Sequence, residues 1–71
     1  MTFKDVIEHL DMTQRIMVNY YPKGGKNHVT QIMNVRRIPW DKLRYWIDCH
    51  VWTIKPKVDK DGKPFLFVGI E

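Results

Sequence analysis

The sequence predicts a small α+β domain with the order α-β-β-α-β-β, in which two short helices pack on a four-stranded antiparallel sheet. Three patterns predict this class: two stretches with apolar residues at helical spacing, four stretches that alternate between two faces, and Gly-containing turns between paired strands. The 71 residues form one expected domain, 1–71. A domain of this size buries only about 60% of the surface that its unfolded chain exposes.

The first helix is expected to begin at a capping box. Thr2 and Asp5 have the spacing at which a hydroxyl and a carboxylate satisfy the free N–H groups of the first helical turn. Apolar residues then recur at i, i+3, i+4 and i+7, namely Phe3, Val6, Ile7 and Leu10. We expect this helix to end near Asp11.

Two strands are expected next, from Arg15 to Tyr21 and from His28 to Ile38. Both are rich in residues that favour strands, and their side chains alternate between two faces. Residues 22–27 join them, and two adjacent glycines in this segment supply the positive φ that a reversing chain needs. The second strand therefore returns beside the first.

A second helix is expected after Pro39, because proline cannot extend the preceding strand. The carboxylate of Asp41 suits the positive end of a helix dipole. Helical spacing then places five residues on one face: Trp40, Leu43, Trp46, Ile47 and His50. The opposite face of this helix carries charged residues and a tyrosine.

After His50 the period changes from helical spacing to two, which indicates a strand. This alternation puts Trp52, Ile54 and Val58 on one side. We expect Trp46 and Trp52 to lie inside the protein, because each belongs to an apolar stripe.

The last two strands are expected at Val51–Val58 and Phe65–Ile70, joined by a turn that contains an Asp-Gly pair. Both faces of the final strand are apolar, and Phe65 and Phe67 lie on the face opposite the aliphatic residues. Helices on one side of the sheet cover only one of these faces. The face with the two phenylalanines is therefore either folded onto itself or offered to a partner.

The net charge of +4 is concentrated in the middle of the chain. Residues 22–45 carry six cations and one acid, whereas the segments before and after them are close to neutral. A basic segment of this kind indicates an anionic partner, either nucleic acid or an acidic protein surface. The alternative is that the positive charge serves only solubility.

No motif predicts catalysis or phosphate binding. The Gly-Lys pair of residues 25–26 lacks the other residues of a phosphate-binding loop, and the Asp-rich turn of residues 59–62 lacks those of a calcium loop. A structural zinc is the one cofactor that the residue types suggest, although no close ligand spacing is present. Its candidate ligands are His9, His28, Cys49 and His50. The alternative is a buried cysteine with ordinary surface histidines.

A second group of candidate site residues interleaves cations with an aromatic residue: Arg36, Arg37, Lys42, Arg44 and Tyr45. Arginine and tyrosine are common anchors of protein interfaces, and the same mixture suits nucleic-acid bases and phosphates. The helical spacing places the last three residues away from the core. We therefore expect this group to bind a partner, with Phe65 and Phe67 as a competing surface.

Three stretches of the chain form a pattern. Met1 to Ile7 has the pattern of a capped helix, Leu43 to Trp52 that of a second short helix leading into a strand, and Leu66 to Glu71 that of a closing strand of alternating aliphatic residues. In this pattern the chain resembles the short proteins of phages and prophages that infect low-GC Gram-positive bacteria. Several of those proteins are anti-CRISPR inhibitors of RNA-guided nucleases. Many such inhibitors are acidic DNA mimics, whereas this chain is basic. The resemblance therefore implies that it blocks a nuclease lobe or a guide-loaded channel.

The resemblance and the lack of a catalytic constellation favour a non-enzymatic phage inhibitor. It would bind a host defence nucleoprotein, such as a type II RNA-guided nuclease, and block nucleic-acid loading or cleavage. The basic segment leaves a second class open, a small nucleic-acid-binding or regulatory module. The sequence has no run of about 18 apolar residues, so we expect no membrane association. The single cysteine fits a reducing environment, and we expect a cytoplasmic location in the bacterial host. We expect the protein to be a monomer or a weak dimer.

Overall fold

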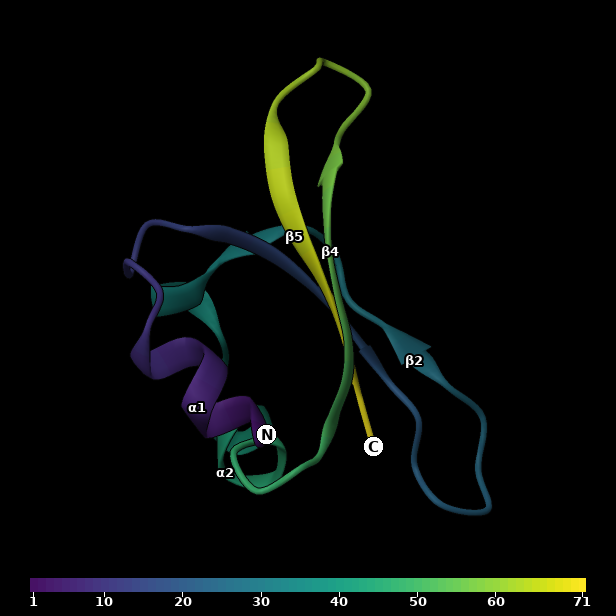
Figure 1. The fold of residues 1–71 in the computed structure, drawn as a ribbon. Coiled ribbons are helices and arrows are strands. Elements are labelled where there is room, and N and C mark those ends of the chain that lie inside the picture. Colours follow the sequence, from purple (N-terminus) through teal and green to yellow (C-terminus); the bar gives the residue numbers. More distant parts are fainter.

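The computed structural model describes residues 1–71 and confirms the predicted α+β class, with two α-helices and a sheet (Figure 1). A 3-10 helix precedes the second α-helix. The elements in chain order are α1 (Phe3–Glu8), β1 (Arg15–Tyr20), β2 (His28–Val29), β3 (Met33–Asn34), η1 (Val35–Arg37), α2 (Trp40–Trp46), β4 (Val51–Val58) and β5 (Pro64–Ile70). Neither α-helix is long or apolar enough to cross a membrane.

The sheet has five strands and is mixed rather than purely antiparallel. Its order is β2-β1-β5-β4, and β3 also pairs with β1. β1 runs antiparallel to β2 and β3 but parallel to β5, and β5 runs antiparallel to β4. The parallel pair arises because the chain crosses over through η1 and α2 before it forms the last hairpin. β5 thereby lies in the centre of the sheet beside β1.

The segment expected to form one strand from His28 to Ile38 is divided into β2, β3 and η1. The Thr30 side chain interrupts the ladder, because its hydroxyl accepts a hydrogen bond from Val18 N at 3.0 Å where a backbone carbonyl would otherwise do so. The same hydroxyl donates to Gln31 O at 3.0 Å. Alternation in the sequence does not reveal that a side-chain hydroxyl takes the place of a backbone carbonyl as the acceptor.

The capping box predicted at the N-terminus is confirmed. Asp5 N donates to Thr2 Oγ1 at 3.3 Å, and Thr2 N donates to the Asp5 carboxylate at 3.0 Å. The helix ends at Glu8, slightly earlier than expected. Backbone bonds from Phe3 N to Cys49 O and from Val51 N to Met1 O, both 2.9 Å, hold this terminus beside the start of β4.

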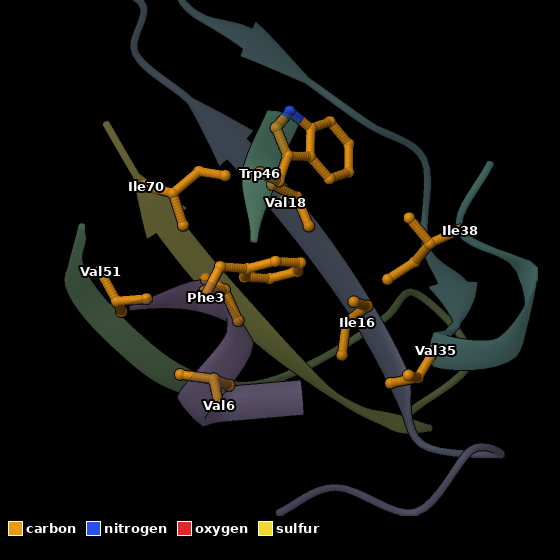
Figure 2. Close-up of a cluster of buried hydrophobic side chains, with 10 residues drawn as sticks. Phe3, Val6, Ile16, Val18, Val35, Ile38, Trp46, Val51 and Ile70 are labelled. Carbon is orange, nitrogen blue, oxygen red and sulfur yellow. The ribbon is translucent and has the colours of Figure 1, made fainter. Parts of the chain in front are cut away.

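The core lies between the two helices and one face of the sheet (Figures 1 and 2). Phe3 and Trp46 meet there edge to face, with ring centroids 6.0 Å apart, so the prediction that Trp46 lies inside is confirmed. Strand residues close the cluster from the sheet side: Ile16, Val18, Val51, Val68 and Ile70. Val6, Val35 and Ile38 complete it around the helices.

The prediction that Trp52 lies inside is wrong, because its side chain is 46% exposed. The register shifts between Val51 and Thr53, which makes Trp52 the extra residue of a β-bulge. Val51 pairs with Ile70 and takes the core position instead. The bulge thus turns the tryptophan to the sheet face that carries no helix.

Candidate functional site

The five residues expected to bind a partner in the middle of the chain are all exposed and lie on two consecutive elements. Arg36 and Arg37 belong to η1, and Lys42, Arg44 and Tyr45 belong to α2. We call these five residues the basic helical face.

The orientation of α2 follows from its apolar residues. Trp46 is buried and Leu43 packs against the core, so these two side chains fix which side of the helix faces the sheet. Lys42, Arg44 and Tyr45 are consequently turned outward, as the helical spacing predicts. Trp40, at the start of the helix, is 72% exposed and adds a second aromatic ring beside the basic helical face.

Arg44 and Tyr45 interact directly on this surface. The Arg44 guanidinium carbon lies 5.1 Å from the centroid of the Tyr45 ring. Arg44 Nη2 also donates to the Tyr45 hydroxyl at 3.4 Å. Guanidinium over an aromatic face is a favourable arrangement at exposed sites, and it restricts both side chains.

The four cations of the basic helical face have no ion-pair partner. The protein contains two ion pairs, Lys4 with Glu8 and Arg15 with Asp59, and both lie elsewhere. Asp41 is the single acid on α2, and it makes no ion pair. The positive charge of this face is therefore not neutralised within the protein.

The basic helical face lies between two hollows. Lys42 and Tyr45 line a cavity of about 600 Å³ whose other walls include His28 and Val29 of β2. Arg36 lines a second cavity of about 350 Å³ on the α1 side. The structure thus brings Lys42, Arg44 and Tyr45 together and places Arg36 on the other flank.

A second surface is the sheet face opposite the helices. Paired residues on neighbouring strands point to the same side, so the register identifies its members. Met17 pairs with Phe67, which pairs in turn with Lys55, and Lys57 pairs with Phe65. Six half-buried or exposed residues of this side define what we call the open sheet face: Met17, Tyr21, Trp52, Lys55, Lys57 and Phe67.

The two phenylalanines expected on this surface differ in exposure. Phe65 is buried, with only 6% of its surface exposed, whereas Phe67 is half-buried. Lys57 Nζ lies 4.6 Å from the centroid of the Phe67 ring. Of the two predicted contact residues, Phe67 is therefore the one that a partner can reach.

Tyr21 and Trp52 form the most exposed aromatic pair of the open sheet face, with ring centroids 5.2 Å apart. A buried amide supports the pair, since Asn19 Nδ2 donates to the Tyr21 hydroxyl at 2.9 Å. Asn27 Nδ2 donates in turn to Asn19 Oδ1 at 3.2 Å. Sequence reasoning missed this pair, although a glycine inside the last strand indicates a bulge or a close approach.

The four candidate zinc ligands do not converge, and the expectation of a metal site is wrong. No three His, Cys, Asp or Glu side chains lie close enough together to hold a metal ion. His9 caps the end of α1, His28 lies on the edge strand β2, and His50 forms an isolated bridge with Thr2. Only Cys49 and His50 are neighbours in the sequence, and no short ligand spacing brings the other two residues to them.

Cys49 does not have the properties of a reactive thiol. Its Sγ donates to Tyr45 O at 3.4 Å. Burial raises the pKa of the thiol, and the neighbouring Asp48 carboxylate raises it further. The side chain therefore stays protonated near neutral pH, which does not suit a nucleophile.

No protein-family model matches the chain, and neither a curated protein nor a solved structure matches it significantly. The basic helical face and the open sheet face are therefore the two surfaces whose chemistry indicates a function.

Proposed function

We propose that the protein is a non-enzymatic, phage-encoded inhibitor. It binds a host defence nucleoprotein, such as a type II RNA-guided nuclease, in the bacterial cytoplasm through the basic helical face. The observation that carries this proposal is the set of four cations on η1 and α2 that lack any ion-pair partner in the protein itself.

The side chains of this face suit a protein interface. Binding energy in such interfaces is concentrated in a few arginine, tyrosine and tryptophan side chains, while charges at the rim accelerate the encounter. Arg44 and Tyr45 already contact each other, and Trp40 lies exposed at the start of the same helix. The two hollows beside α2 can receive side chains of a partner.

The sign of the charge decides how inhibition would work. A basic face cannot imitate the phosphates that a nuclease reads next to its target. It can instead cover an acidic surface of a nuclease lobe or the nucleic acid held in the guide-loaded channel. Either contact would block nucleic-acid loading or cleavage without chemistry by the inhibitor.

A cleavage assay with a guide-loaded type II nuclease tests the proposal. We expect the parent protein to inhibit cleavage and Arg37→Glu combined with Arg44→Glu to lose inhibition. Lys60→Glu combined with Lys63→Glu is the matched control, because it makes the same change in net charge at the exposed turn between β4 and β5. The proposal fails if the parent does not inhibit or if both double variants inhibit equally.

The same free cations favour a second function, a small nucleic-acid-binding or regulatory module. A mobility-shift assay with bare duplex DNA and duplex RNA separates the two. Binding at micromolar concentration that weakens steeply with salt supports the second function, because neutralised phosphates release their counterions. An inhibitor that covers an acidic surface of the nuclease predicts no such shift.

A further inference from the structure

The ring of Trp52 lies against the backbone of the central strand. A Cβ atom placed on Gly69 would come within 2.6 Å of two atoms of the indole ring, Cε2 and Cζ2. The glycine therefore leaves the space that the ring fills, and the β-bulge turns the ring toward it. Nearly half of the residue, 46%, remains exposed to solvent.

Tyr21 is held next to this ring by both its backbone and its hydroxyl. Tyr21 N donates to Ile70 O at 2.8 Å, and the hydroxyl accepts the hydrogen bond from Asn19. The tyrosine itself is 39% exposed. The two rings form a fixed aromatic surface, so a ligand that stacks on them loses little side-chain entropy in the protein.

The charge on the β4 side of the open sheet face is positive, whereas Glu71 lies just beyond the end of β5. None of the five strands contains an acidic residue, whereas β4 contributes Lys55 and Lys57 to the open sheet face. The carboxylate of Asp59, which follows β4, is bound by Arg15 Nη2 at 2.7 Å. Fixed aromatic rings beside unpaired lysines complement a ligand with flat rings and negative charge.

We propose that the open sheet face binds single-stranded nucleic acid. Bases stack on Trp52 and Tyr21, and Lys55 and Lys57 contact the phosphates. Single strands expose the base faces that a duplex hides, and stacking on aromatic side chains is the common way in which proteins hold them. This inference does not depend on the proposed inhibitor function, which uses the opposite side of the protein.

Fluorescence anisotropy of a short labelled oligothymidylate tests the proposal. We expect Trp52→Ala to weaken binding roughly 5- to 150-fold, which corresponds to the ~1–3 kcal/mol that stacking contributes per base. Trp40→Ala is the matched control, because it removes a more exposed tryptophan from α2, and it should leave the affinity unchanged. Trp52→Phe keeps an aromatic ring and should retain much of the affinity. It is the variant to measure if Trp52→Ala does not fold.

The salt dependence gives a second readout. Lys55→Ala combined with Lys57→Ala should reduce the slope of log affinity against log salt by about 0.7 for each lost phosphate contact. Arg37→Glu combined with Arg44→Glu should bind the oligothymidylate as the parent does, so the two proposals can fail separately. Absence of binding by the parent at low salt overturns the inference, as does equal binding by the parent and Trp52→Ala. Displacement of the oligothymidylate by an acidic peptide of equal charge would instead assign the face to a protein partner.

Discussion

Gly69→Ala is expected to destabilise the protein by displacing Trp52. The added Cβ would meet the indole ring at 2.6 Å and Thr53 Cγ2 at 2.8 Å, and both distances are too short for real contacts. Gly69 does not have a positive φ, so the cost is one of packing and not of backbone strain. Crowding of this kind costs about 1–3 kcal/mol. A smaller entropy of the unfolded chain offsets about 0.4–1 kcal/mol of it.

Urea unfolding followed by far-UV circular dichroism measures this effect, with an expected net loss of about 1–2 kcal/mol. Each kcal/mol corresponds to a fall in Tm of roughly 4–8 °C for a domain of this size. The clash with the ring disappears in a Trp52→Ala background, so Gly69→Ala should cost less there by about 1 kcal/mol. The cost should remain in a Trp40→Ala background. Equal costs in the parent and in Trp52→Ala would refute the contact between the glycine and the ring.

Two further predictions concern titratable groups. The hydrogen bond from Arg15 lowers the pKa of Asp59, and the backbone N–H groups of Lys63 and Asp61 lower it further. The ionised Asp59 carboxylate therefore stabilises the fold above about pH 4, and this stability is lost as the pH falls further. Between pH 6 and pH 3 the parent should therefore lose more stability than Asp59→Asn, measured by urea unfolding, and parallel losses would contradict this role. The raised pKa of Cys49 predicts slow alkylation by iodoacetamide at pH 7.5 in mass spectrometry; a rate equal to that of an unstructured cysteine peptide would contradict it.

The sequence predicted those parts of the fold that depend on local spacing. The capping box at Thr2 and Asp5, the inward position of Trp46 and the outward position of Tyr45 all follow from helical periodicity, and the structure has them. The parallel pairing of β1 with β5 was not predicted, because it joins residues far apart in the chain. Local alternation specifies which residues share a face but not which strands become neighbours.

The β-bulge had the largest consequence for the candidate sites. One extra residue in β4 exchanged the positions of Val51 and Trp52, which moved a tryptophan from the expected core to the open sheet face. The metal hypothesis was wrong because residue types alone do not determine whether residues such as His28 and Cys49 lie close together in the fold. The outward positions of Lys42, Arg44 and Tyr45 followed from helical spacing, whereas η1, which carries Arg36 and Arg37, had been expected to belong to a strand.

Direct binding of a guide-loaded type II nuclease to immobilised variants tests the assignment of the working surface most directly. We expect Arg37→Glu combined with Arg44→Glu to abolish binding while circular dichroism shows an intact fold, since exposed substitutions usually change stability by no more than about 0.5 kcal/mol each. Phe67→Ala, if folded, should bind as the parent does. If the double charge reversal binds like the parent and folded Phe67→Ala does not, the basic helical face serves only solubility and the sheet contacts the nuclease.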